Sequence, residues 1–415
     1  MLIFVQDRNM ASIISRLVGA FYPTVVAKRD DAIKLGILGA ANVAHMSLLT
    51  PAKSHPEIAI QAVAARDRKK AEEYAKANGI PEVKGSYQEM LDDKNIDAIY
   101  IPLPNSFHYE WAIRCIKAGK HVLVEKPCVS NAHEAEKLFN LPELSQPNGP
   151  VILEAFHTLF YPSWQYFLSF VNPEEIEHIR SQSMLPWFFT SKDGIIFDYN
   201  LSGGAMICMG TYNFAAIRQL FRAEPVECLS CETQTFSGEG REKCDITFKA
   251  KFRFPNGAIA ETESTVRGST IWTPSSVIVT NKEIIVPDKS LPSGQEKVLK
   301  RELTLYGFLY GIVWHRIDIK DMYTIRSNGK VIKTWEEKGS HKAYTFKEAG
   351  GKFAGFPGED TWISYRHMLE QFVNKVKGRE TQTWVSGEDS IGHMRMIDMA
   401  YEKSGLGIRP TRKYE

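Results

Sequence analysis

The chain has 415 residues, of which 43% are hydrophobic, and a formal net charge of +2. This length is enough for two domains with well-buried cores. Lysine and arginine are spread along the chain and form no basic arm or tail, so we expect neither nucleic acid nor an anionic membrane as a partner. No apolar run approaches the roughly 20 residues of a membrane-spanning helix, and we expect a cytoplasmic protein.

The six cysteines are few for a chain of this length, and we expect them to be the reduced thiols of a cytosolic protein. Cys228 and Cys231 have C-x-x-C spacing, but no second pair or histidine cluster completes a zinc site. Their segment alternates like a strand, which predicts that the two side chains point to opposite faces. We therefore predict no metal site.

Residues 1–32 precede the first regular pattern and carry four basic residues. An organelle transit peptide, which is basic and amphipathic, is one interpretation of this segment. The favoured interpretation is a short helix that packs on the body of the protein, followed by a polar linker to Lys34. We therefore treat residues 1–32 as an N-terminal extension.

From Lys34 onward, short apolar strands alternate with helices. This alternation indicates a parallel sheet that is covered by helices on both faces. Residues 33–155 are thus predicted to form an α/β domain, a doubly wound Rossmann sheet that binds a dinucleotide. The expected strands are 34–38, 58–65, 97–104, 121–124 and 151–156. One expected helix ends at about residue 53, and the others span 68–79, 106–119 and 131–140.

The pattern changes after about residue 175, where strands follow one another without intervening helices. Such runs are typical of an antiparallel sheet with one wetter face. Residues 156–415 are thus predicted to form an α+β domain with an open, mostly antiparallel sheet, whose last helices pack back on the first domain. Residues 286–350 show no readable pattern. The expected strands are 231–238, 244–254, 257–266 and 275–280, and the expected helices are 362–378 and 389–405.

A softened dinucleotide fingerprint follows the first expected strand. Gly39, Ala41 and Ala44 stand at the glycine positions of G-x-G-x-x-G. Small residues there allow backbone N–H groups and a helix N-terminus to approach a pyrophosphate. Because the turn joins a strand to a helix, we predict a cofactor site rather than an ordinary tight turn. Its predicted residues are Gly39, Ala41, Asn42 and Val43.

The end of the second expected strand bears on the choice of cofactor. Arg66 falls where the chain should reach the adenosine ribose, and no acidic residue precedes it. A guanidinium fork suits a 2′-phosphate, whereas NAD enzymes usually offer a carboxylate there. The placement favours NADP(H) over NAD(H). The alternative is a solvated first helical turn with Asp67 as its N-cap.

Glu125, Lys126 and Pro127 directly follow the strand 121–124. The strands of a doubly wound sheet have their carboxyl ends at the ligand crevice, so Lys126 should lie near a bound nicotinamide. An ammonium there can polarise a carbonyl or hydrogen-bond an alcohol, and partial burial would lower its pKa toward the range of proton transfer. From spacing alone, a solvated lysine at the start of a loop is an equal alternative.

These motifs resemble the family of glucose–fructose oxidoreductase, inositol dehydrogenase and MocA. The family's marks are a Rossmann domain, the Glu-Lys-Pro tripeptide and a second domain built on an open sheet. The resemblance runs from Lys34 to the C-terminal GIRP and includes the segment GGAMICMGTY, residues 203–212. The joint presence of EKP and EAF…P is similar to the branch of D-xylose dehydrogenases and dimeric dihydrodiol dehydrogenases.

The resemblance implies that Lys126 and Tyr212 are catalytic. A phenol and an ammonium around one hydroxyl group form a sensible proton relay for hydride transfer. Without the resemblance, Tyr212 would be interpreted as a core aromatic residue of the helix that follows it. The resemblance also implies that a strand-end loop and an acid lie at the cofactor, and these residues are Pro104, Asn105, His108 and Glu125, together with Lys126.

Two positions depart from the family pattern and remove charge from the expected substrate pocket. Cys208 stands where the family usually has Asp, and Leu159 stands where many relatives of this branch have Arg. We expect Cys208 and the rings of His157, Tyr161 and Trp164 to line the pocket, since aromatic hydrogen-bonding walls suit sugar faces. Packing of the three rings in the domain junction is an equal alternative.

We therefore expect an NADP(H)-dependent oxidoreductase that acts on a sugar or polyol-like alcohol or carbonyl, of the aldose 1-dehydrogenase type. The resemblance also implies a homodimer formed through the sheet of the second domain. Two alternatives remain open. One is a nucleotide-sensing regulatory protein on the same fold, which the loss of charge at Cys208 and Leu159 favours, and the other is an NAD-dependent glycosidase of the same family.

Overall fold

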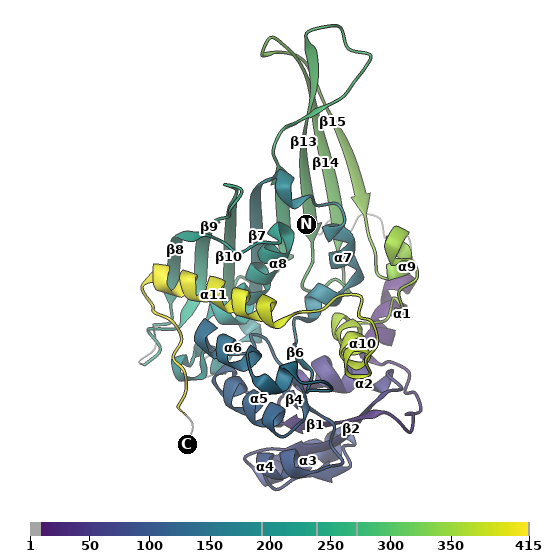
Figure 1. Ribbon diagram of the computed structural model, residues 1–415, viewed down its shortest axis with the longest axis vertical. Coiled ribbons are helices and arrows are strands. Elements are labelled where there is room, and N and C mark those ends of the chain that lie inside the picture. Colours follow the sequence, from purple (N-terminus) through teal and green to yellow (C-terminus); the bar gives the residue numbers. More distant parts are fainter. Residues whose placement is uncertain (1–9, 192–193, 238–239, 271–272, 414–415) are drawn as a thin grey trace.

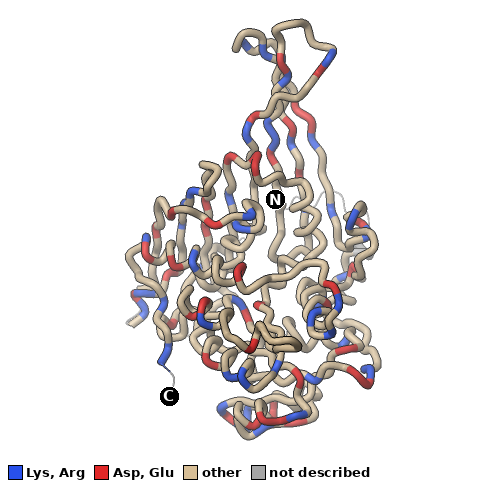
Figure 2. The backbone as a smooth tube through the Cα atoms, in the orientation of Figure 1, with Lys and Arg blue, Asp and Glu red and all other residues tan. Residues whose placement is uncertain are grey.

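The structure, a computed structural model, describes residues 10–191, 194–237, 240–270 and 273–413. Residues 1–9 of the expected N-terminal extension lie outside this range. The described chain forms two sheets, each with helices packed against it, and an arm that projects from the second sheet (Figure 1). Acidic and basic residues are interspersed along the backbone of the body and of the arm (Figure 2).

The first sheet has six parallel strands in the order β3-β2-β1-β4-β5-β6. This order is that of a doubly wound dinucleotide-binding sheet, and it confirms the predicted Rossmann architecture. The central strand β4 is completely buried, because helices cover both faces of the sheet. The strands are β1 (Ile33–Leu38), β2 (Ile58–Ala64), β3 (Glu82–Val83), β4 (Ala98–Ile101), β5 (His121–Val124) and β6 (Ile152–Glu154).

The helices of this domain begin where the sequence offers a cap. The side chains of Asp67, Ser86 and Asn131 each accept a hydrogen bond from the backbone N–H three residues later, as N-caps do. The helix after β2 ends at Gly79, which has a left-handed conformation with φ of 65°. The elements are η1 (His45–Leu49), α2 (Thr50–Lys53), α3 (Arg68–Asn78), α4 (Tyr87–Asp92), α5 (His108–Lys117) and α6 (Ala132–Phe139).

The second sheet has nine strands in the order β15-β14-β13-β11-β7-β10-β9-β8, with β12 paired to β13. Only the pair β7 and β10 is parallel, so the predicted mostly antiparallel sheet is confirmed. Helices α8 and α11 cover one face of it (Figure 1). The elements are β7 (Ile176–Pro186), α8 (Thr211–Phe221), β8 (Glu227–Thr235), β9 (Asp245–Arg253), β10 (Ile259–Gly268), β11 (Ser276–Asn281), β12 (Ile284–Val286), β13 (Gln295–Tyr306), β14 (Arg316–Ser327), β15 (Lys330–His341) and α11 (Gly387–Ser404).

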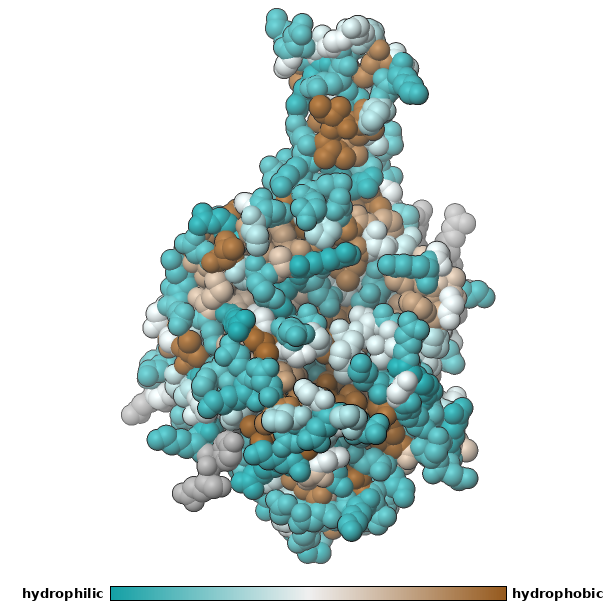
Figure 3. Space-filling model, in the orientation of Figure 1, coloured by the Kyte–Doolittle hydropathy of each residue, from teal (hydrophilic) through white to brown (hydrophobic). Residues whose placement is uncertain are grey.

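The segment without a readable pattern consists largely of β12 to β15, residues 284–341, whose outer parts form the arm. Its long strands β13, β14 and β15 extend beyond the body (Figure 1), and β15 is exposed at all but two of its residues. Both faces of the outer arm meet water, so the usual alternation of buried and exposed residues is lost. An apolar patch lies on the arm (Figure 3). Ile285 of β12 and Val331 and Ile332 of β15 are exposed.

The last helices pack back on the first domain. Asp398 of α11 accepts a hydrogen bond from the N–H of Ala132, the first residue of α6 (Oδ2–N 2.8 Å). Helix α10 (Ser364–Val376) packs against η1 and α2. The N-terminal helix α1 (Met10–Phe21) lies beside α10 and the short helix α9 (Phe346–Ala349) (Figure 1).

The C-x-x-C segment differs from its prediction. Cys228 pairs with Phe252 and Cys231 pairs with Ala250, and a bulge at Leu229 interrupts the register between them. The extra residue of a bulge turns the following side chains over, so both thiols lie on the core face of the sheet. The predicted opposite orientation was therefore wrong. Within the described ranges, no three metal-ligating residues cluster, and no helix is long and apolar enough to cross a membrane.

Candidate active site

Two neighbouring cavities flank the turn that follows β1. The first has a volume of about 430 Å³ and is lined by the turn residues Gly39 to Ala41 and by Arg66. The second has a volume of about 320 Å³, and its wall includes Asn42, Val43 and Tyr212. Because both lie at the carboxyl ends of the parallel strands, they occupy the crevice where doubly wound sheets bind ligands.

The fingerprint turn has the geometry that the sequence predicts. Gly39 has a φ of 99°, and a Cβ atom there would lie 3.0 Å from Cδ2 of Leu103. The backbone N–H groups of Ala44 and His45 donate to the carbonyl groups of Ala41 and Asn42 and so start the helical turn. A bare backbone at the start of a helix fits a pyrophosphate.

Arg66 lies exposed at the wall of the first cavity, with its guanidinium carbon 5.9 Å from the ring centroid of Phe107. Asp67 caps α3, since its Oδ1 accepts from the N–H of Lys70 at 3.2 Å. The alternative role for Asp67 is therefore observed. The helix cap engages the side chain of Asp67, whereas the guanidinium of Arg66 remains at the cavity.

Lys126 follows β5 and reaches across to the second domain. Its Nζ donates to the carbonyl oxygen of Cys208 at 3.1 Å and lies 4.4 Å from the ring centroid of Tyr212. Burial by itself would lower the pKa of Lys126, but the neighbouring Tyr212, Cys208 and Glu125 groups raise it above its ordinary value. The predicted lowering of this pKa was wrong, because the combined effect of the neighbouring groups outweighs desolvation. Lys126 is a permanent ammonium.

Glu125, the neighbour of Lys126 in sequence, is buried. Only 6% of the residue is exposed, and its Oε1 accepts from the hydroxyl of Tyr100 at 2.6 Å. That hydroxyl also contacts Oγ of Ser47 in η1 at 2.5 Å. Burial raises the pKa of the Glu125 carboxyl. The side chain thus connects β4, β5 and η1 and lines neither of the two cavities.

Tyr212 stands in the first turn of α8, where its hydroxyl lies 3.1 Å from Nε2 of His157. Nδ1 of His157 lies 2.7 Å from Oγ of Ser364, and its ring stacks on Tyr365 with centroids 3.8 Å apart. A neutral imidazole accepts at one nitrogen and donates at the other. Tyr212 can therefore donate to Nε2 while Nδ1–H donates to Ser364.

Burial sets the protonation states of this pair. It raises the pKa of Tyr212 to about 12, although Lys126 acts in the opposite direction. Burial, together with the Lys126 charge, lowers the pKa of His157 to about 3. The phenol therefore keeps its proton and the imidazole stays neutral over the physiological range. Next to a fixed ammonium, such a pair can transfer a proton to or from an alcohol oxygen.

Several predicted site residues lie elsewhere. Trp164 is only 1% exposed, and its Nε1 donates to Oε1 of Gln219 at 2.6 Å. The indole packs inside the second domain, with ring centroids 6.0 Å from Phe167 and 6.1 Å from Phe308, and does not line either cavity. His108 is completely buried, with ring nitrogens 3.0 and 2.7 Å from the carbonyl groups of Pro127 and Leu103. It therefore holds the two strand-end loops together from inside, and its place at the cofactor stays a prediction.

The remaining predictions divide between the cavities. Pro104 lines the first, and His157 and Tyr161 line the second. Asn105 donates through Nδ2 to the carbonyl of Ser202 at 3.3 Å and so joins the first domain to the second. The side chain of Cys208 is half-buried, and its carbonyl, not its thiol, holds Lys126.

Sequence reasoning missed the residues that complete the second cavity. Ser364 and Tyr365 begin α10, more than 200 positions after His157. Phe21 ends the N-terminal helix, and residues 308–313 follow β13. The sequence offered no signal for Ser364. For Phe21, the signal was its position as an aromatic residue at the end of an amphipathic helix.

The comparisons with known proteins agree with this geometry. Residues 33–146 match the sequence model of the GFO/IDH/MocA oxidoreductase family with an NAD-binding Rossmann fold. Residues 174–285 match the model of the GFO/IDH/MocA C-terminal domain. The chain belongs to the GFO/IDH/MocA family. It is therefore a nucleotide-cofactor-dependent oxidoreductase by family.

Its relatives in this family include dehydrogenases. The D-xylose 1-dehydrogenase (NADP(+)) 2 of Haloferax volcanii is 28% identical over 90% of this chain and 97% of its own length. A trans-1,2-dihydrobenzene-1,2-diol dehydrogenase of Xenopus laevis is 28% identical over 61% of this chain and 80% of its own length. An uncharacterized oxidoreductase of Rhizobium meliloti is 37% identical, and the alignment spans 47% of this chain and 58% of that protein.

Among solved structures, the 3-ketoreductase KijD10 of Actinomadura kijaniata, in complex with NADP and TDP-benzene, has the same fold. It superposes with a TM-score of 0.63 over 88% of this chain and 96% of its own chain, at 19% sequence identity. At this identity the likeness shows the fold alone.

Proposed function

We propose that this GFO/IDH/MocA protein is an NADP(H)-dependent oxidoreductase that transfers a hydride between the nicotinamide and a sugar- or polyol-like alcohol or carbonyl. The observation that supports this most is that Tyr212 and His157 line the cavity next to the fingerprint turn, with the Lys126 ammonium 4.4 Å from the ring centroid of Tyr212. The bare backbone at Gly39 fits a dinucleotide. A bound nicotinamide would supply or accept the hydride.

The chain's own residues would handle the proton and the charge. In reduction, the Tyr212 hydroxyl donates its proton to the carbonyl oxygen, while the Lys126 ammonium stabilises the negative charge that develops there. In oxidation, Tyr212 accepts the alcohol proton and passes its own toward Nε2 of His157, 3.1 Å away. Ser364 holds His157 in the required orientation.

The preference for NADP(H) rests on Arg66. Its guanidinium borders the first cavity near the fingerprint turn, and Asp67 is engaged as a helix cap. A carboxylate at position 66 would repel a 2′-phosphate and accept from a 2′-hydroxyl. We expect Arg66→Glu to weaken NADPH binding at least tenfold while NADH binding is kept or improved, as measured by fluorescence titration. Arg68→Glu, which changes an exposed residue paired with Glu72, is the control.

Turnover of the purified protein tests the proposed activity. NADPH oxidation is followed by its absorbance with a panel of sugar lactones and ketones, and NADP+ reduction with aldoses and cyclic diols. We expect turnover with at least one combination of cofactor and substrate. Tight NADPH binding without turnover on any compound would instead support the nucleotide sensor, for which the uncharged Cys208 and Leu159 are the sequence evidence.

We also propose that the second domain, residues 156–415, dimerises through the open face of its sheet. Rows of opposite charges cross that face, with Lys251 Nζ 2.7 Å from Glu261 Oε1 and Lys249 Nζ 3.3 Å from Glu263 Oε2. Such alternating rows can pair with a second copy. Sedimentation analysis should give a dimer, and the double variant Glu261→Lys, Glu263→Lys should give a monomer. A monomeric wild type would refute the proposal.

A further inference from the structure

Two segments outside the family-matched ranges meet at the substrate side of the second cavity. One is α1, which precedes residue 33, and the other is the loop 307–313, which follows residue 285. Arg16 of α1 is 5% exposed, and its Nε donates to the carbonyl oxygen of Ile312 at 3.2 Å. The guanidinium also lies 3.6 Å from the ring centroid of Tyr344. The buried arginine thus ties α1 to the loop.

Helix α1 is closely packed on the body rather than loosely attached. A Cβ atom at Gly19 would lie only 2.5 Å from Cγ2 of Thr361, so only a glycine allows this approach. Ala20 is 3% exposed. The end of α1, at Phe21, is therefore fixed against the segment that leads into Ser364 and Tyr365.

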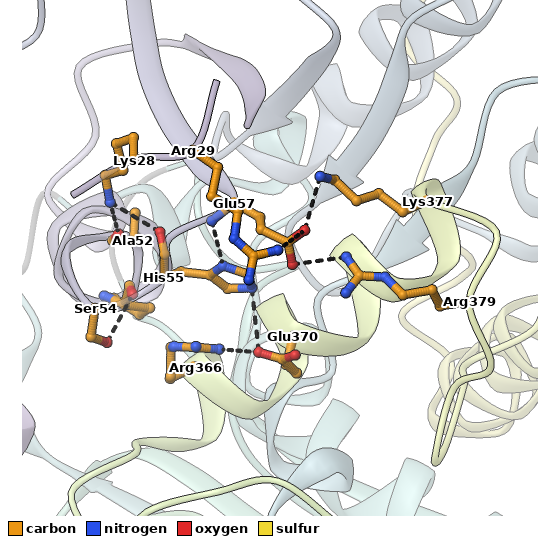
Figure 4. A network of polar contacts seen from close by, with 11 residues as sticks. Lys28, Arg29, Ala52, Ser54, His55, Glu57, Arg366, Glu370, Lys377 and Arg379 are labelled. Atoms are coloured by element: carbon orange, nitrogen blue, oxygen red, sulfur yellow. Dashed lines mark hydrogen bonds and ion pairs between the residues drawn. The ribbon is translucent and has the colours of Figure 1, made fainter. Parts of the chain in front are cut away.

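The linker from α1 to β1 is held by the polar network of Figure 4. Nζ of Lys28 donates to the carbonyl groups of Ala52 and His55 at 2.6 and 3.0 Å. Arg29 pairs with Glu57, which also accepts from Lys377 at 2.9 Å. The network joins the linker to the turn before β2 and to the end of α10. The part of the linker that leads into β1 is thereby fixed to both domains.

The cavity has a polar end and an apolar end. His157, Tyr212 and Ser364 gather at the polar end. Large apolar side chains that remain 39–44% exposed surround the rest, which is unusual unless a ligand covers them. They are Phe21, Val43, Met46, Tyr310 and Val313. Val43 and Met46 follow the fingerprint turn, so a bound nicotinamide would cover part of them. Phe21, Tyr310 and Val313 then remain for the substrate.

We propose that Phe21 and the loop 307–313 form a specificity wall that selects substrates with an apolar ring or chain on the side away from the reacting carbon. Arg16 is its positioning residue. The inference rests on the proposed function and narrows its substrate class to cyclic alcohols or ketones with a hydrocarbon flank. A free aldose has hydroxyl groups on every flank, and these would be buried without partners against Phe21 and Val313.

The test compares two alcohols in the wild type and in Phe21→Ser. With NADP+, we expect kcat/KM for trans-cyclohexane-1,2-diol to exceed that for D-xylose at least tenfold in the wild type. Phe21→Ser should reduce this ratio at least fivefold, mainly through the KM of the diol, with NADP+ affinity unchanged. Val18→Ser, on the same helix and 54% exposed, should leave the ratio unchanged. An unchanged ratio in Phe21→Ser would overturn the proposal.

A binding measurement separates this proposal from the proposed activity. Calorimetric titration of the diol into the protein–NADP+ complex needs no turnover. If the wild type binds the diol without turning it over, and Phe21→Ser weakens this binding, the proposed activity is refuted and the specificity wall is retained. Turnover of D-xylose with no measurable binding of the diol would retain the activity and overturn the wall. Arg16→Gln should weaken binding of the diol, and Arg16→Lys should restore part of it.

Discussion

Lys126 acts as a fixed positive charge, because its position between the Cys208 carbonyl and the face of Tyr212 keeps it protonated. The proton is handled by Tyr212 and His157, whose pKa values lie far apart. This division of roles separates charge stabilisation from proton transfer. It also makes the site insensitive to moderate changes of pH.

The reduction rate should therefore be independent of pH between about 6 and 9. Tyr212, with its pKa raised to about 12, keeps its proton throughout this window and loses it only above it. His157, with its pKa lowered to about 3, stays neutral throughout and is protonated only below it. The kcat of NADPH-dependent reduction measured across this range tests the point. A change in kcat with a midpoint near pH 6.5, where an ordinary histidine titrates, would contradict this expectation.

Removal of one oxygen atom tests the proton donor. Tyr212→Phe keeps the ring under the Lys126 ammonium and deletes the hydroxyl that contacts His157. We expect kcat to fall by about 10² to 10⁴, the range of a lost general acid, while the Kd of NADPH is unchanged. Tyr166→Phe, in helix α7 (Pro162–Leu168), should behave as the wild type in the same steady-state assay. Wild-type kcat in Tyr212→Phe would assign the proton to another group.

At the scale of elements, the sequence pattern predicted those helices and strands whose formation depends on residues that are near in sequence. The strand–helix alternation from Lys34 to Glu154 was readable because buried parallel strands are continuously apolar. The strands of the arm were not readable, because strands that are exposed to water on both faces show no alternation of apolar and polar residues. The contact between His157 and Ser364 joins residues 207 positions apart, and only tertiary packing brings them together. The burial of Trp164 likewise depends on Gln219 and Phe308, which are distant in sequence.

Helix α11 offers a test of local stability because it packs on β8, α6 and α8. Its N-terminus has a complete capping box, in which Ser386 and Asp389 bond each other's backbone N–H groups. Ser386→Ala should lower the free energy of unfolding by about 1 kcal/mol, as measured by urea denaturation. Glu388→Ala, an exposed change in the same turn, should cost less than half as much. Equal effects would show that the cap does not stabilise the helix.

At the scale of the whole molecule, two domains share a core that encloses neutral histidines. Burial lowers their pKa values below the ordinary 6.5, so below that pH the unfolded chain binds protons that the folded chain does not. Stability then falls as pH falls, by about 1.4 kcal/mol per pH unit for each such histidine. Their pKa values are about 2 for His55, 4 for His108, 3 for His157 and 3 for His367.

Buried carboxyl groups act in the opposite direction. Burial raises the pKa values of Glu154 and Asp398 to about 7, so the folded chain gains stability from them as pH falls from about 7 to their ordinary range. Burial also raises the pKa values of Glu125, Glu134 and Asp245 and lowers those of His121, His178 and His393, so the histidines still outnumber the carboxyl groups. We expect the Tm to be lower at pH 5.0 than at pH 7.5. His367→Phe should reduce the difference. A Tm at pH 5.0 equal to or above that at pH 7.5 would contradict the account.

The central claim, that the Lys126 site performs hydride transfer, is tested most directly by single-turnover oxidation of bound NADPH with a carbonyl substrate found in the panel. The account predicts that Lys126→Ala binds NADPH with wild-type affinity but oxidises it at least 10²-fold more slowly, whereas Lys117→Ala, an exposed lysine of α5, reacts at the wild-type rate. Lys126→Ala that oxidises NADPH as fast as the wild type would contradict the account.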